Sequence, residues 1–280
     1  TVGPKGISQP LDLQNVRSES VHANQIGYRP DDPVKRAFLS IWLGTGGAYA
    51  FADGLGFSLI EEATNKSVFS GKVERVLTID GKEQLWTKPP KNYSSTAVYR
   101  MDFSAYNTPG AYRVYVEGVG CSYPFEIGRP VWEKAFLTQM KGLYNQRSGV
   151  ELGPPYTEFK KPRDFHPDDG AVITRSKYDV LAKGSPYAYA DMMKGDTGEV
   201  VKDAWGGYHD AGDWNPRRVT HMYTTLAQLE LCELYPDYFN KLNLNIPPVD
   251  GVPDMISEAL FEIDCFRRLQ MPDGAIPYGI

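Results

Sequence analysis

The hydrophobic period of this chain changes at residues 128–130, and no other feature of the sequence constrains the fold as strongly. Before this point, from Arg36 to Ile127, short runs of β-branched and aromatic residues are interrupted by Gly, Pro, Asn and Asp, which is typical of strands. After it, apolar residues recur at spacings of three and four, which is typical of amphipathic helices. Because the chain has 280 residues, there is room for two domains. We therefore expect an all-β domain followed by an all-α domain.

The β segment is expected to form a sandwich, because several short strands follow one another at close spacing. Its last clear strand alternates apolar and polar residues with period two, so one face of the sheet should be buried. A single histidine, His22, stands in this segment without other candidate catalytic groups, which favours a structural role. The clearest strands are expected over Arg36–Trp42, Val98–Phe103 and Tyr112–Val116.

Three helices are expected after Pro130. The first covers residues 131–144, the second runs from Met222 to Tyr235 and is ended by Pro236, and the third opens at residues 253–254, where a proline and a carboxylate suit a helix start. The expected buried stripe of the second helix is Met222, Leu226, Leu229 and Cys232, and that of the third is Ile256, Ala259, Leu260, Ile263 and Phe266.

Charged residues on the second and third helices are expected at the surface. Glu230 and Glu233 lie off the second apolar stripe, and Glu258 and Glu262 are interpreted as surface charges of the third helix. The cysteines Cys121, Cys232 and Cys265 form no CxxC pair, so buried free thiols are expected.

Composition excludes two classes of partner. The chain has 30 Lys+Arg against 35 Asp+Glu and no basic run, so we expect no nucleic acid partner. No apolar stretch approaches the ~18 residues of a membrane helix, so no membrane insertion is expected. A signal peptide is not present in this sequence, which leaves any export signal outside it.

Residues 148–220 show no sustained period but are rich in aromatic residues, which favours a functional loop over a disordered linker. Its densest part, WGGYHDAGDWNPRR, holds Asp210 and Asp213 three residues apart. A tight turn could aim both carboxylates at one water molecule, which is the general-base half of an inverting glycosidase. The spacing alone favours a calcium loop or a helix cap, since aspartate is common in both.

Several motifs together resemble family 9 glycoside hydrolases. The segments HANQIGYRPDDPVKRAFL (22–39) and DFSAYNTPGAYRVYVEGVGCSYPFEIG (102–128) resemble the immunoglobulin-like module that precedes the catalytic domain in many of these enzymes. WGGYHDAGDW (205–214) is similar to their GGWHDAGDY signature. FLTQMKGLYNQRSG (136–149) and VPDMISEALFEIDCFRRLQMPDGAIPYG (252–279) are similar to further segments of their catalytic domain.

The resemblance implies an N-terminal immunoglobulin-like β-sandwich followed by an (α/α)6 barrel that is incomplete in this chain. The expected organisation is an extension over residues 1–19, the sandwich over 20–129, and the first portion of the barrel over 130–280. The family supplies its general acid from a glutamate near the far end of the barrel, and no segment here matches that motif. We therefore expect the acid beyond Ile280, and residues 1–280 alone to be inactive.

The resemblance also implies the site residues. Asp213 takes the role of the catalytic base and Asp210 helps to orient the same water, while Trp214, Tyr208, His209, Trp205 and Arg217 are the expected substrate-binding residues. The implied activity is inverting, cellulase-like O-glycosyl hydrolysis of a β-linked glucan by a secreted, periplasmic or cell-surface protein. Arg217 or Arg218, if either reaches the cleft, would favour a decorated glycan.

No cofactor is required for this chemistry. A structural calcium ion is possible, whereas zinc is not expected, because the family positions that supply thiolates in zinc-binding members are Ser148 and Phe165 here. His166 and His209 remain and are expected to hydrogen-bond within the loop, with Asp164 as a less favoured substitute ligand. Two other functions stay open: a carbohydrate-binding protein without hydrolytic activity, and a calcium-stabilised spacer.

Overall fold

A computed structural model describes residues 11–85, 88–176, 196–210 and 219–276. The chain divides into two compact units, Thr1–Phe136 and Leu137–Ile280. The division falls inside the helix α1 (Val131–Asn145), which begins where the sequence predicted a helix. The finer domain bounds expected from the sequence remain a prediction.

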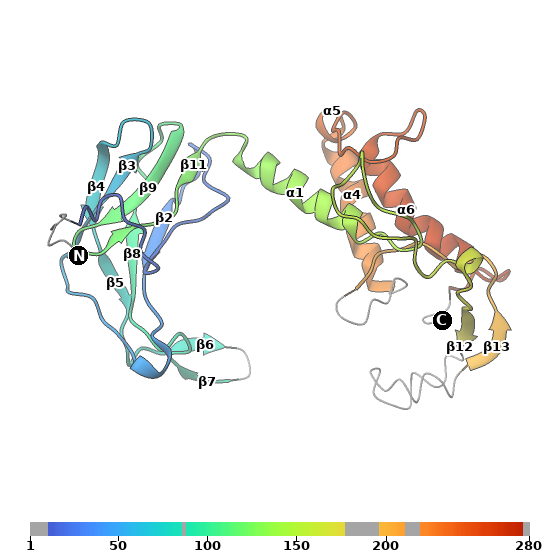
Figure 1. Cartoon of the computed structure of the whole chain (residues 1–280), viewed down its shortest axis with the longest axis horizontal. Coiled ribbons are helices and arrows are strands. Elements are labelled where there is room, and N and C mark those ends of the chain that lie inside the picture. Colours follow the sequence, from blue (N-terminus) through green and yellow to red (C-terminus); the bar gives the residue numbers. More distant parts are fainter. Residues whose placement is uncertain (1–10, 86–87, 177–195, 211–218, 277–280) are drawn as a thin grey trace, which may run out of the picture. The chain divides into compact units, whose positions relative to one another are not determined.

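The first unit is built from two antiparallel sheets, as expected for the β segment (Figure 1). One sheet has the order β1-β2-β8-β5 and the other the order β10-β9-β3-β4, with β11 pairing to β9. A separate hairpin joins β6 and β7, and a short 3-10 turn, η1, follows β2. The bounds are β1 Val21–His22, β2 Arg36–Leu39, η1 Gly44–Gly46, β3 Gly56–Glu61, β4 Ser67–Lys72, β5 Glu74–Leu77, β6 Glu83–Leu85, β7 Lys88–Lys91, β8 Val98–Asp102, β9 Gly110–Val116, β10 Gly120–Cys121 and β11 Phe125–Ile127.

The core of this unit follows the alternation of its strands. Tyr112, Val114 and Val116 on β9 are buried, as the period-two pattern predicted. Arg113, on the other face, is nevertheless only 9% exposed. Its guanidinium donates hydrogen bonds to the segment before β1 and pairs with Glu62 at 2.8 Å. The expected polar face of the strand is therefore covered at this position.

The second unit contains three longer helices at the predicted places. Besides α1, these are α4 (Met222–Leu234) and α6 (Asp254–Leu269), which pack against each other (Figure 1). Pro236 ends α4 but also begins a further short helix, α5 (Pro236–Phe239), since proline is well suited to the first helical position. The remaining described elements are the 3-10 turns η2 (Pro167–Asp169) and η3 (Val219–His221) and the hairpin of β12 (Thr174–Ser176) and β13 (Asp196–Val200).

The face that α4 buries differs from the prediction. Its buried residues are Thr225, Gln228 and Cys232, whereas Leu226, expected in the buried stripe, is 51% exposed. The helical period was correct, but the stripe was rotated, because an apolar pattern alone does not show which face the neighbouring helix covers.

Glu258 and Glu262 on α6 were predicted as surface charges, and this prediction was wrong. Both side chains are fully buried, four residues apart on the face that also carries Ala259 and Phe266. The sequence pattern failed here because burial of a carboxylate depends on partners from other segments, which periodicity does not reveal.

All three cysteines are free and buried, as expected. None of the described helices combines the length and the apolar character that crossing a membrane requires.

Candidate active site

The segment that carries Asp210 is attached to the end of α1 by a short antiparallel backbone pairing. Ser148 N donates to Gly207 O at 2.8 Å, and His209 N donates to Gln146 O at 2.7 Å. Arg147 and Tyr208 form the bridge between these two bonds. The loop therefore reaches Asp210 from a fixed backbone position.

Below this bridge lies a buried cluster around Glu258. Arg147 donates from Nε and Nη2 to the two carboxylate oxygens of Glu258, at 3.2 and 3.0 Å. The Tyr208 hydroxyl donates to Oε1 of the same carboxylate at 2.8 Å. Burying a carboxylate without partners costs desolvation free energy. Arg147 and Tyr208, which are distant from Glu258 in the sequence, offset this cost by hydrogen-bonding to it.

A close backbone approach also shapes the loop. Gly149 has a φ of +74°, and a Cβ atom at this residue would lie 2.9 Å from the backbone nitrogen of Gly206. Gly206 itself has a φ of +97°. Glycine is needed at position 149 because both the backbone conformation and the space exclude a side chain.

Lys161 is the centre of a second polar cluster on the outer side of the loop. Its Nζ donates to Arg147 O at 2.8 Å and to Asp164 Oδ2 at 2.9 Å, and lies 3.2 Å from His209 Nε2. His209 Nε2 is in turn 2.7 Å from Asp164 Oδ2, while Gly149 N donates to Oδ1 of the same aspartate. Burial raises the pKa of Asp164, but the bonds from Lys161 and Gly149 outweigh this effect and hold the pKa below its usual value.

The residues at the family zinc positions do not fit a zinc ion. The Lys161 ammonium lies against His209 and Asp164, on the side where a zinc ion would need the lone pairs of these two residues. Phe165 has no thiolate, and its ring packs against His209. His166 accepts from Asp168 N at 3.2 Å and packs on Trp205. Within the described residues, no group of three or more His, Cys, Asp or Glu side chains is arranged to hold a metal ion.

Two of the expected substrate-binding residues have structural contacts. Tyr208 is 3% exposed and points its hydroxyl into the Glu258 cluster, so its ring is not presented at the surface for stacking on a sugar. Trp205 lies between His166 and the guanidinium of Arg268, which stands 3.8 Å from the ring centroid. The sequence indicated aromatic residues beside acids, but not which rings the fold itself uses.

Asp210 is half-buried at the end of the described loop. Its Oδ1 lies 3.9 Å from His221 Nε2, and the other ring nitrogen of His221, Nδ1, lies 3.7 Å from Oε1 of Glu262. Burial raises the pKa of Glu262 to about 8, and the backbone N–H of Tyr208 offsets only part of this rise. The imidazole of His221 therefore stands between the loop carboxylate and a buried acid.

The remaining predicted site residues, Asp213, Trp214, Arg217 and Arg218, lie outside the described residues. Sequence reasoning missed the supporting side chains: Arg147, Lys161, His221, Glu258 and Glu262. One signal was available for the two glutamates, since their spacing of four residues places both on one face of α6.

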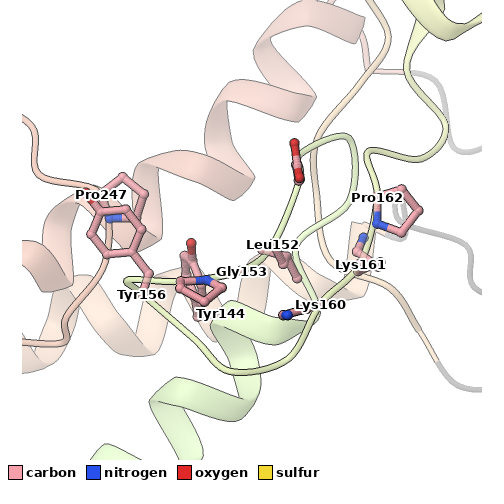
Figure 2. A pocket seen from close by; sticks show the side chains of 10 residues that line it. Tyr144, Leu152, Gly153, Tyr156, Lys160, Lys161, Pro162 and Pro247 are labelled. Carbon is pink, nitrogen blue, oxygen red and sulfur yellow. The ribbon is translucent and has the colours of Figure 1, made fainter.

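A pocket of about 660 Å³ opens beside the Lys161 cluster. Figure 2 shows Tyr156 and Pro247 at one end and Lys161 and Pro162 at the other. Lys161 is the shared residue, since its side chain lines the pocket and its ammonium binds Asp164. Of the predicted catalytic and substrate-binding residues that the structure describes, none lines this pocket.

Comparisons with known proteins agree with this architecture. Residues 16–121 match the family described as the cellulase N-terminal ig-like domain. Endoglucanase D of Acetivibrio thermocellus is 32% identical over 185 residues, which are 66% of this chain and 27% of that protein. The xyloglucan-specific endo-beta-1,4-glucanase BoGH9A of Bacteroides ovatus is 27% identical over 270 residues, which are 93% of this chain and 38% of that protein.

Among solved structures, a metagenome-derived glycoside hydrolase family 9 endoglucanase is 28% identical and superimposes with a TM-score of 0.63. The match covers 91% of this chain and 41% of that one. Residues 16–121 thus match the immunoglobulin-like domain that is found at the N-terminus of cellulases. The chain is a relative of the family 9 glycoside hydrolases, which confirms the sequence resemblance, and it spans less than half the length of each of these relatives.

Proposed function

We propose that the protein containing this chain is a secreted, inverting glycoside hydrolase that cleaves β-1,4-linked glucan chains internally, and that residues 137–280 form part of an (α/α)6 barrel. The observation that carries the proposal is the likeness to BoGH9A, which extends over 93% of the chain and therefore includes the loop that carries Asp210. Xyloglucan is a candidate substrate, because that relative is xyloglucan-specific by name.

In the proposed reaction, the carboxylate of Asp213 removes a proton from a water molecule while Asp210 helps to orient the same water. The activated water attacks the anomeric carbon, and a carboxylic acid on the opposite side protonates the leaving oxygen, so the configuration inverts. The two catalytic carboxyls of such enzymes lie roughly 6.5–9.5 Å apart to leave room for the water. The loop attachment at Gln146 and Ser148 supports the proposal, since a base and its helper need a fixed backbone.

Hydrolysis assays on the full-length protein test this function. The wild-type protein should release reducing ends from β-1,4-glucan or xyloglucan, and proton NMR of the first product should show the inverted anomer. Asp213→Asn should lower turnover by roughly two to four decades while glycan affinity is kept. Asp237→Asn, at an exposed carboxylate on α5, is the matched control and should be as active as the wild type.

Binding without hydrolysis in the wild-type protein would instead support a carbohydrate-binding protein. Stoichiometric calcium lost together with folding on chelation would support the calcium-stabilised spacer. A retained anomer, or full turnover in Asp213→Asn, would contradict the proposed mechanism.

A further inference from the structure

The two buried glutamates of α6 differ in their surroundings. Glu258 is paired with Arg147 and with the Tyr208 hydroxyl, so its negative charge is compensated. Glu262 is equally buried, yet in the part of the chain that the structure describes neither of its carboxylate oxygens accepts a hydrogen bond of ordinary geometry, and the backbone N–H of Tyr208 offsets only part of the effect of burial on its pKa. An ionised carboxylate in such a place would carry the full desolvation cost, so the group is held as the neutral acid.

The imidazole of His221, on η3, faces this acid. Its Nδ1 is 3.7 Å from Glu262 Oε1, and its Nε2 is 3.9 Å from Asp210 Oδ1. Glu262 and Asp210 thus lie on opposite sides of one ring, the first in the core and the second at the proposed reaction site.

Among the described residues, two further titratable groups near Glu262 are Glu258 and Tyr208. On its own helix, Glu258 is occupied by Arg147, from the segment after α1, and by Tyr208, from the Asp210 loop. Burial raises the pKa of Tyr208 well above its usual value, so this hydroxyl stays neutral. His221 is therefore the group through which a change of charge at Glu262 reaches the loop.

We propose that Glu262 is a positioning residue that acts through His221 on Asp210, so that the charge of this buried acid controls the orientation of the loop carboxylate. When Glu262 is neutral, the side of the His221 ring that faces the core meets no charge on this acid. When Glu262 loses its proton at higher pH, the new negative charge acts on the His221 ring and changes how the ring interacts with Asp210. This inference rests on the proposed function, because it assigns Asp210 to the water-orienting pair.

The first test does not depend on activity. Histidine ring resonances of the protein, assigned with His221→Asn, should show an inflection near pH 8 for His221, in the range of the pKa raised by burial of Glu262. Glu262→Gln has nearly the same shape but cannot ionise, and it should remove this inflection. Glu230→Gln, at an exposed carboxylate on α4, should leave it unchanged. A His221 titration that is the same in wild type and Glu262→Gln would overturn the inference.

The second test measures kcat/KM of the full-length protein against pH on β-1,4-glucan. Relative to the wild type, Glu262→Gln should gain activity as pH rises from 7 to 9, with a change of about tenfold in the ratio and with KM unaltered. Parallel profiles would overturn the inference even if the wild-type protein is active. An inactive wild-type protein would instead contradict the proposed function, while the resonance test still decides whether Glu262 and His221 are coupled.

Discussion

At the scale of single residues, the helical unit is held by compensated charges whose partners come from distant segments. Arg147 with Glu258, and Lys161 with Asp164 and His209, join the end of α1, the following loop and α6. None of these pairings follows a local spacing rule, apart from the i,i+3 relation of Lys161 and Asp164. This is why the sequence indicated the acidic loop but not the groups that support it.

Removing one partner of the buried pair should be more damaging than removing both. Arg147→Met leaves the Glu258 carboxylate uncompensated, so we expect the free energy of unfolding to fall by about 3–5 kcal/mol. The double variant Arg147→Met, Glu258→Leu should recover at least half of this loss, because no buried charge remains. Urea unfolding followed by tryptophan fluorescence measures both. Equal losses in the single and double variants would contradict the argument.

The buried acid Glu262 should make stability depend on pH. Its pKa is raised from 4.5 to about 8 in the folded protein, so between these values the folded state retains a proton that the unfolded state releases. The free energy of unfolding should therefore fall as pH rises from about 4.5 to 8 and then level off. Glu262→Gln lacks this contribution and should gain on the wild type with rising pH, by ~5 kcal/mol at most. Identical pH profiles would contradict the assigned shift.

Lys161 should be needed for the loop that it anchors. Lys161→Met removes the cation from Asp164 and His209, so we expect the free energy of unfolding to fall by about 1.5–3 kcal/mol. Lys160→Met, at the exposed neighbouring residue, should leave this free energy almost unchanged.

The same cluster should not retain zinc. Wild-type protein that is exposed to zinc and then mildly chelated should hold less than one equivalent of zinc by elemental analysis. Stoichiometric, chelator-resistant zinc would show that the cluster can be rearranged around a metal.

At the scale of elements, periodicity predicted which segments become helices and strands but not which face each one buries. The starts of α1, α4 and α6 and the alternation of β9 were all readable, because a period of 3.6 or 2 is a local property. The buried face of α4 was not readable, since its neighbour α6 covers Thr225 and Gln228 instead of the larger apolar residues. Tertiary contacts decided the orientation.

This difference gives a prediction for α4. In residues 1–280, Leu226→Gln should change the free energy of unfolding by less than about 0.5 kcal/mol, because the side chain is 51% exposed. Cys232→Gln, on the buried face, should cost several times more. Thermal unfolding of Leu226→Gln distinguishes the observed face from the predicted stripe, and Cys232→Gln is the reference for a residue that lies on both.

At the scale of the whole molecule, the strand pattern and the family resemblance predicted different things: the strand pattern predicted the strands of the first unit, and the resemblance predicted the catalytic roles. The β architecture of the first unit and its strands β2, β8 and β9 could be predicted, because these segments are short and bounded by turn residues, whereas its immunoglobulin-like character was implied by the resemblance. The catalytic roles depended on the resemblance around Asp210 and Asp213, since a spacing of three residues is too short to specify a reaction. The proposed general acid is not matched by any motif of this chain.

The same reasoning predicts how residues 1–280 behave by themselves. The chain spans 27% to 41% of the length of its named relatives. The resemblance implies a general acid in a later part of the proposed barrel. We expect no measurable hydrolysis of β-1,4-glucan by residues 1–280, but activity in the full-length gene product. An active 280-residue protein would require a second acid among the carboxylates of this chain.

The ammonium group of Lys161 has a consequence for the chemistry of the loop. A cluster centred on a side chain is built from the folded polypeptide itself. Covalent modification can therefore disrupt the cluster, because acetylation or carbamylation of the Lys161 amine would remove the positive charge between Asp164 and His209. Reagents that modify amines, rather than those that strip metals, should therefore be the ones that loosen the loop.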